Sequence, residues 1–348
     1  MIPFFATTVA LAGVPELSEA RIEADILSLS DGSIAESRNI QHPGNAAAQQ
    51  WIADAFRAID GLEVHEDVFD AVIREPDEPD IVVPGIANVV ADLPGADPSQ
   101  PWILITAHLD STGSSEDGYD PTTDPAPGAD DDASGVAAAL EIARVLSTNE
   151  YEATIRFIAF NAEEEGLLGA FWHAGNLDGQ PIRLVMNMDP VGFNPFGAGV
   201  LWATYDARFP DDAFALETLA PELSDLLTVL PTDSAMPILD GARRSDHAPF
   251  WDEGYAALHL ASFPQPGEYH TAEDTIDVVD PEFTVAVATL VAHHAAELAV
   301  EIEPEPEPMV DEKKGCGCVS GGSPLSWWPL LAIAALLRRK NFIGPCHD

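Results

Sequence analysis

Three short, mainly apolar segments constrain the fold of this chain more than any other feature. Each has the length of a buried strand and lies near Gly, Pro or polar residues: 102–107 (WILITA), 154–160 (TIRFIAF) and 182–188 (IRLVMNM). Strands that are apolar along most of their length are typical of a parallel sheet covered by helices on both faces. The segments therefore predict an α/β fold with a mixed, largely parallel central sheet.

The segments around these strands alternate between strand and helix patterns. Apolar residues recur at helical spacing in 44–59, 134–146 and 282–302, and further strands are expected at 62–69, 86–93 and 255–263. Alternation of this kind is typical of a sheet flanked by helices. We place a single domain over residues 15–302.

Acidic and histidine residues follow four of the predicted strands. In open α/β sheets, ligands bind at the carboxyl ends of the strands, so these side chains are expected in one crevice. They are His108 and Asp110 after the first strand, Glu163 and Glu164 after the second, Asp189 after the third, and His270 in the loop after 255–263.

A run of three aspartates, Asp130 to Asp132, lies between two of these strands in "PGADDDASG". The run is either a solvated acidic loop or part of a metal site, because burying adjacent carboxylates without a cation is costly. Imidazole and carboxylate ligands suit zinc, with manganese or cobalt as substitutes. Two such ions about 3.5–4 Å apart form a hydrolytic site.

Six motifs, in order, resemble one known family over about residues 20–300: "AHLDS", "PGADDDASG", "AEEEGLLGA", "MDP", "SDHAPFW" and "YHTAED". It is the zinc peptidase family that includes bacterial leucyl aminopeptidases, glutaminyl cyclases and glutamate carboxypeptidases. Each motif alone is weak, and the six in order are specific. The resemblance implies a zinc exopeptidase-like fold with a single catalytic domain.

The same resemblance implies a set of five metal ligands for two zinc ions. His108 and Asp189 hold one ion, Glu164 and His270 hold the other, and Asp131 bridges them. It also implies a cis peptide bond directly after the bridging Asp131.

Three further residues take catalytic roles by the resemblance. Glu163 is the general base, Asp110 orients His108, and Tyr269 helps to hold the oxyanion. Pro190, after Asp189, departs from the commonest pattern of the family and alters the edge of the pocket. A disulfide found near the pocket in some relatives is excluded, because residues 1–315 contain no cysteine.

Other polar residues near the motifs receive structural roles. We assign Asp130 and Asp132 to a helix cap and a charged loop, and Glu165 to a position behind the ligands or facing solvent. His247 either lines the substrate pocket or stabilises a loop. His293 and His294 are expected on the surface or in packing.

The resemblance implies a metallo-aminopeptidase that acts on the N-termini of peptides or proteins, and the patterns at the two ends of the chain predict that it is exported. A glutaminyl-peptide cyclase shares most of the ligand set and is the alternative enzyme. A glutamate-type carboxypeptidase usually carries extra domains, for which this chain has no room. A non-catalytic surface binding protein on the same fold typically loses ligands or the base, and here all are present.

The charge of the chain argues against nucleic-acid binding. There are 59 acidic residues against 15 Lys and Arg, a net charge of −44. Such a surface suits a salt-rich medium, where ions screen the self-repulsion. Salt adaptation is therefore one hypothesis, and simple acidic solubility is the other.

Both ends of the chain carry targeting patterns. Residues 1–14 contain a short apolar run without a basic start, which is either a truncated signal peptide or a buried first segment. A Glu/Pro- and Gly-rich linker is expected at 303–324, an apolar segment with a basic end at 325–340, and a tail at 341–348. The C-terminal part resembles a MYXO-CTERM sorting tail with Cys316 as the processing position. This implies engagement of the membrane and sorting machinery, and a secreted or cell-surface location.

Overall fold

The computed structural model describes residues 13–74, 79–197, 199–235 and 242–300. The described residues belong to one compact unit. The predicted linker, apolar segment, tail and Cys316 lie outside the described residues, as does nearly all of the predicted signal segment. The domain boundaries that involve them stay predictions.

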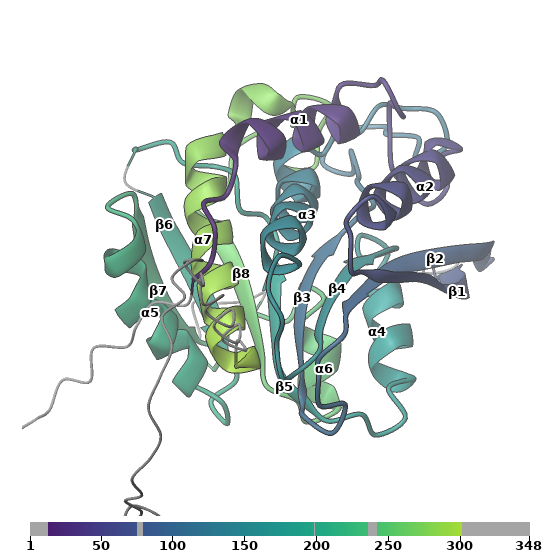
Figure 1. Cartoon of the computed structure of the whole chain (residues 1–348). Helices are drawn as coiled ribbons and strands as arrows, with labels where there is room; N and C mark the ends of the chain where they lie inside the picture. Colours follow the sequence, from purple (N-terminus) through teal and green to yellow (C-terminus); the bar gives the residue numbers. More distant parts are fainter. Residues whose placement is uncertain (1–12, 75–78, 198, 236–241, 301–348) are drawn as a thin grey trace, which may run out of the picture. The chain divides into compact units, whose positions relative to one another are not determined.

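An eight-stranded sheet forms the centre of the described structure, in the order β1-β2-β4-β3-β5-β8-β6-β7 (Figure 1). Its strands are β1 Glu63–Ile73, β2 Ile81–Leu93, β3 Trp102–His108, β4 Ile155–Phe160, β5 Ile182–Met188, β6 Gly199–Tyr205, β7 Leu227–Asp233 and β8 Ala257–Phe263. The central strands β4, β3, β5 and β8 are parallel. The β1/β2, β2/β4 and β6/β8 pairs are antiparallel, so the sheet is mixed and largely parallel as predicted.

Helices cover both faces of the sheet (Figure 1). They are α1 Glu19–Ser30, α2 Gly44–Arg57, α3 Gly135–Leu146, α4 Leu168–Gly175, α5 Asp211–Leu223, α6 Ala248–Asp252 and α7 Pro281–Ala299, with a π-helical turn η1 at Ala129–Ser134 and a 3-10 turn η2 at Ile276–Val278. Helices α3 and α7 pack on each other and on β3, and α1 contacts both of them. Helices α4 and α6 contact each other and bury side chains in a separate core cluster.

The alternation of side chains along the central strands explains the apolar segments of the sequence. In β3, Ile103 and Ile105 belong to the core under α3 and α7, whereas Leu104 belongs to the core under α4 and α6. Successive side chains of a strand point to opposite faces, so a strand covered on both faces has to be apolar throughout. Complete burial of each such side chain contributes about 1.5–3 kcal/mol to folding.

The predicted elements correspond to α2, α3, α7, β1–β5 and β8, with ends that differ by a few residues. Strands β6 and β7 and helices α1, α4, α5 and α6 carried no prediction. Strand β7 lies at the edge of the sheet and exposes Thr228 and Leu230, so it lacks a continuous apolar run. Its burial depends on the α5–β7 contact, which a local pattern does not show.

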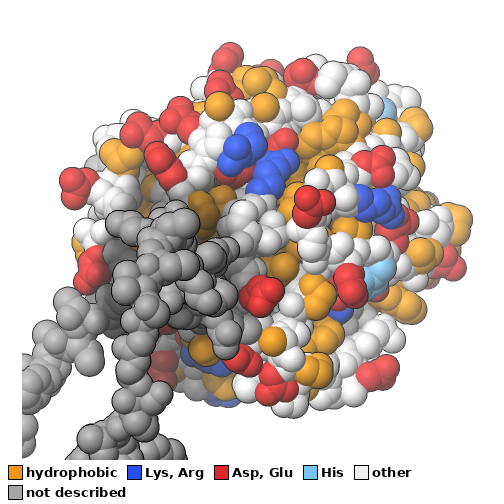
Figure 2. All heavy atoms as spheres, in the orientation of Figure 1, with side chains coloured by type: hydrophobic (Ala, Val, Ile, Leu, Met, Phe, Trp, Pro, Cys, Tyr) orange, Lys and Arg blue, Asp and Glu red, His pale blue; other side chains and the backbone are white. Residues whose placement is uncertain are grey.

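The parallel central strands all end at the same edge of the sheet, which positions the polar residues that follow them. His108 ends β3, Glu163 and Glu164 follow β4, and Asp189 follows β5. On the outer surface, Asp and Glu side chains are spread over the face in Figure 2, and the blue side chains, which are all Arg in the described residues, lie in small groups. Among the described residues, no helix combines the length and apolar character needed to cross a membrane.

Candidate metal centre

His108, at the end of β3, faces two carboxylates with the same ring nitrogen. Its Nε2 lies 2.9 Å from Oδ1 of Asp131 and 3.3 Å from Oδ1 of Asp189. All three side chains are buried, with at most 9% of a side chain exposed. The other ring nitrogen, Nδ1, lies 3.1 Å from the main-chain carbonyl of Asp110, which fixes the ring. Nε2 therefore faces one carboxylate oxygen of Asp131 and one of Asp189.

A second group of three ligand atoms shares Asp131. The Nε2 of His270 lies 3.0 Å from Oδ2 of Asp131 and 3.1 Å from Oε2 of Glu164. The Nδ1 of His270 lies 3.3 Å from the hydroxyl of Ser114. The two oxygens of Asp131 therefore face different histidines, which is the arrangement that a bridging carboxylate requires.

The residues present fit zinc. Tetrahedral zinc with bonds of about 2.0–2.2 Å separates neighbouring ligand atoms by about 3.3–3.6 Å, close to the separations above. Two atoms of the second group, Oδ2 of Asp131 and Nε2 of His270, are buried and have no hydrogen-bond partner. Buried polar atoms are normally paired, so these are the atoms on which a cation is expected.

The charges of the group support the same conclusion. Burial would lower the pKa of His270, but Asp131 and Glu164 raise it to about 10. Burial, together with Asp131, raises the pKa of Glu164 to about 7. In the absence of a cation, the negative charge of the carboxylates thus favours the protonated forms of His270 and Glu164. A metal ion that binds here replaces these protons.

The other two aspartates of the run are buried, so a solvated loop is wrong for them. Asp132 lies within 4.8 Å of His108 and Asp189 and could be mistaken for a ligand. However, its two oxygens accept the backbone N–H groups of His108 and Gly135, each at 3.0 Å. Gly135 is the first residue of α3, whose N-cap residue is Ser134, so Asp132 holds the start of the helix from a position before the cap. Asp130 accepts the N–H of Gly192 at 2.8 Å. Both residues fix the backbone around the ligands.

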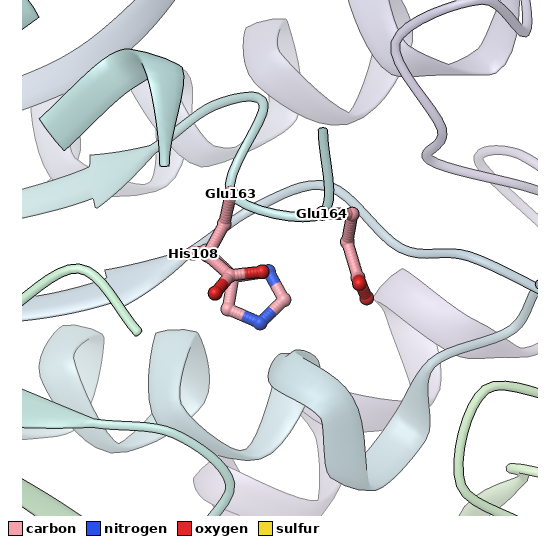
Figure 3. A group of neighbouring side chains, drawn as sticks. All are labelled: His108, Glu163 and Glu164. Carbon is pink, nitrogen blue, oxygen red and sulfur yellow. The ribbon is translucent and has the colours of Figure 1, made fainter. Parts of the chain in front are cut away.

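Glu163 lies beside both groups. Its carboxylate, the imidazole of His108 and the carboxylate of Glu164 point toward the same space, within 4.8 Å of one another (Figure 3). Burial raises the pKa of Glu163 well above its ordinary value, and the nearby Asp189 and Glu164 add to the effect.

Ala162 and His270 both have positive φ, 61° and 59°. Left-handed conformations of non-glycine residues cluster at functional sites.

Asp110 was predicted to orient His108. It lies beside His108, but its carboxylate makes its hydrogen bonds to other residues. It is 3.6 Å from the Nδ1 of His108, beyond hydrogen-bond distance. Instead its two oxygens accept the backbone N–H groups of Glu163 and Glu164 at 3.1 and 3.2 Å. The orientation of His108 comes from the Asp110 carbonyl, while the carboxylate fixes the turn that carries both glutamates.

The remaining predicted residues are also placed. Tyr269 stacks on His270, with ring centroids 3.7 Å apart. His247 is fully buried and stacks on His259, and its Nε2 lies 2.8 Å from the carbonyl of Ala242, which supports a loop. His294 is buried against Asp212, and His293 is half-buried on the same helix. Glu165 is half-buried near Asn39. The peptide bonds after Asp131 and Asp189 are cis, the first as the resemblance implied.

A buried chain of hydrogen bonds that the sequence did not reveal supports Asp189. Thr106 donates to Asn187 at 2.7 Å, the Asn187 amide donates to Ser245 at 2.6 Å, and the Ser245 hydroxyl donates to Oδ2 of Asp189. This leaves Oδ1 of Asp189 to face His108. Ser245 belongs to the quoted "SDHAPFW" motif, so the motif signalled the segment but not the role.

The adjacent Asp246 and two more charged residues were also missed. Both carboxylate oxygens of Asp246 are buried without a partner, and burial raises its pKa well above the ordinary value. Arg38 and Asp274 both form hydrogen bonds with the loop that carries Asp131. Arg38 is a rare cation in an acidic chain, and Asp274 ends the "YHTAED" motif; these were the available signals.

Residues 88–295 match the family described as peptidase family M28. The chain belongs to this family. A probable zinc metalloprotease of Leptosphaeria maculans is 36% identical over 188 residues, covering 52% of this chain and 43% of that protein. Aminopeptidase YwaD of Bacillus subtilis is 30% identical over 217 residues, covering 61% and 44%. The chain thus spans less than half the length of these two relatives.

A solved structure shows how far the fold extends beyond close relatives. The glutaminyl cyclase of Bacteroides thetaiotaomicron has a TM-score of 0.65 with 20% identity, over 80% of this chain and 98% of that one. The fold predicted for this M28 protein is confirmed. The fold is shared with an enzyme named as a cyclase, so fold alone does not select a reaction.

Proposed function

We propose that this M28 protein is a metallo-aminopeptidase that binds two zinc ions and hydrolyses the N-terminal bond of peptides. The observation that carries the proposal is the division of Asp131 between two histidines. One of its oxygens lies 2.9 Å from His108 and the other 3.0 Å from His270. With Asp189 and Glu164, this gives two ligand groups that share one carboxylate, as in two-metal hydrolases.

In this proposal His108, Asp131 and Asp189 hold one zinc ion, and Asp131, Glu164 and His270 hold the other. The ions, when bound, supply a Lewis acid that polarises the scissile carbonyl and lowers the pKa of water. The family assignment and the YwaD relative support peptide substrates.

The protein's own residues perform the proton transfers. Glu163 is buried beside His108 and Glu164, and burial raises the pKa of its carboxyl group, which makes the carboxylate a stronger proton acceptor. It takes a proton from the attacking water and returns it to the leaving amine. Asp110 holds the turn of Glu163, and Tyr269 offers its hydroxyl to the oxyanion.

The proposal is tested with the Glu163→Gln variant, which keeps the size of the side chain and removes the base. Wild-type protein loaded with zinc is assayed on a panel of aminoacyl-nitroanilides, and bound metal is counted for both proteins. We expect release by the wild type, a decrease of about 10²–10⁴-fold in the variant, and two ions in each. Hydrolysis at the wild-type rate in the variant contradicts the role of Glu163.

The cyclase alternative has its own measurement. A peptide with N-terminal glutamine yields ammonia and an uncleaved cyclised peptide if the protein is a cyclase, and a free amino acid if it is an aminopeptidase. Export and surface location are proposed from the sequence patterns at the two ends of the chain. Comparing the mass of the mature protein with that of the full chain tests whether the chain is cleaved near residue 14 and near residue 316.

A further inference from the structure

The loop that carries Asp131 lies between two buried residues of opposite charge. Resting on the proposed function, we propose that Arg38 and Asp274 form a clamp that holds Asp131 in its bridging orientation before metal binds. Neither residue belongs to the two ligand groups or to the proton-transfer residues. Both are positioning residues, since they act through the backbone of the loop.

Arg38 holds the loop by its carbonyl groups. Its side chain is 1% exposed. Its Nη2 donates to the carbonyl of Gly128 at 2.9 Å and its Nη1 to the carbonyl of Pro127. Its Nε donates to the carbonyl of Leu109 at 2.8 Å. One guanidinium therefore connects the loop of Asp131 to the segment that follows His108.

Asp274 holds the same loop by its N–H groups. It is 2% exposed, and its two oxygens accept the N–H of Asp130 at 2.9 Å and of Asp131 at 3.1 Å. Its main-chain carbonyl accepts the N–H of Ala129 at 3.0 Å. Because Asp274 lies four residues after His270, this contact joins Asp131 to the loop that carries the second histidine.

The two charges have complementary tasks. A cation binds carbonyl oxygens and an anion binds N–H groups, so together they fix successive peptide units of the loop from both sides. The loop needs such support because three neighbouring carboxylates repel one another. Arg38 also places a positive charge close to four carboxylates: Asp110, Asp131, Asp132 and Asp274.

Gly128 shows how closely the clamp fits. Its φ is +55°, and a Cβ at this position would lie 2.3 Å from the carbonyl oxygen of Asp131 and 2.9 Å from Nη2 of Arg38. The backbone can approach the guanidinium this closely only without a side chain. The glycine, the arginine and the aspartate therefore define one conformation of the loop.

The test measures zinc affinity in folded protein, because a residue that only stabilises the fold does not change it. Arg38→Lys keeps the charge and loses the planar set of donors. Asp274→Asn keeps the shape and replaces one acceptor by a donor. Arg156→Met and Asp212→Asn are the matched controls, as both remove a largely buried, ion-paired charge away from the metal centre. Zinc affinity is obtained by competition with a chromophoric chelator, alongside the zinc-induced rise in melting temperature.

We expect Arg38→Lys and Asp274→Asn each to weaken zinc binding about 10- to 100-fold, as loss of supporting contacts around metal ligands does. In the double variant, the fold loss of zinc affinity is expected to be smaller than the product of the losses in the two single variants, because both residues hold one loop. The controls are expected to keep the wild-type affinity although they melt earlier. If Arg38→Lys does not fold, the isosteric Asp274→Asn carries the test.

The two proposals fail in different ways. A wild-type chain that binds no zinc contradicts the proposed function. A wild-type chain that binds two ions, while the folded variants bind them within twofold of the same affinity, overturns only the clamp. Equal loss of affinity in the clamp variants and the controls overturns it as well.

Discussion

Replacing Asp110 by Asn tests how the glutamate turn is held. The Asp110 carboxylate is fully buried and accepts the N–H groups of Glu163 and Glu164 at 3.1 and 3.2 Å. In Asp110→Asn one oxygen becomes an NH2 group, which faces one of these N–H groups and leaves it unpaired. A hydrogen bond to a charged acceptor contributes about 1.5–3 kcal/mol, and an unpaired buried donor costs about 1–3 kcal/mol.

We therefore expect the variant to lose about 2–4 kcal/mol of unfolding free energy. This loss is smaller than the 5–15 kcal/mol stability of a typical domain, so the protein still folds. The turn of Glu163 shifts, and a displacement of about 1 Å reduces the rate about 100-fold. His108 keeps its contact with the Asp110 carbonyl, so zinc stays bound.

Urea unfolding gives the stability and a nitroanilide assay gives kcat. The matched control is Asp92→Asn, which breaks the pair with Arg156 at 2.7 Å away from the metal centre. The control is expected to lose stability and to keep its kcat. The reasoning is refuted if Asp110→Asn keeps kcat within twofold, or if the two variants lose kcat equally.

Three further predictions follow from the charges and the backbone. Burial would raise the pKa of Asp212, but bonds from His294 and Arg183 lower it to about 2. Ionised Asp212 therefore stabilises the folded state by about 2 kcal/mol above its ordinary pKa of 3.8, and this stabilisation is lost as the pH falls toward 2. In urea titrations, the difference in unfolding free energy between the wild type and Asp212→Asn is expected to shrink over that pH range. Gly128→Ala, which forces a Cβ to within 2.3 Å of the Asp131 carbonyl, is expected to reduce zinc affinity and kcat together, and unchanged zinc competition would contradict the close fit. Melting temperature and activity are expected to rise with sodium chloride, because the Debye length falls from about 10 Å at 0.1 M to about 3 Å at 1 M and the repulsion between acidic side chains weakens. A fall in both would leave simple acidic solubility as the explanation for the net charge of −44.

The amino-acid sequence by itself determined the architecture and the group of residues at the centre. Continuous apolar segments predicted strands buried on both faces. Successive side chains of a strand point to opposite faces, so a strand that is apolar at every position has both faces covered. The parallel order of β3, β4 and β5 then brings His108, Glu164 and Asp189 to one edge. The six ordered motifs placed the chain in a peptidase family, which the match over residues 88–295 confirmed.

The tertiary structure decided which carboxylates face a ligand and which hold the backbone. Asp131 and Asp132 are neighbours of the same type, yet one faces two histidines and the other accepts two N–H groups. This difference depends on the direction of a side chain relative to distant segments. Arg38 meets the Asp131 loop across about 90 residues of sequence. Contacts of such separation leave no local pattern, because spacing along the chain carries information only about neighbours on one helix or strand.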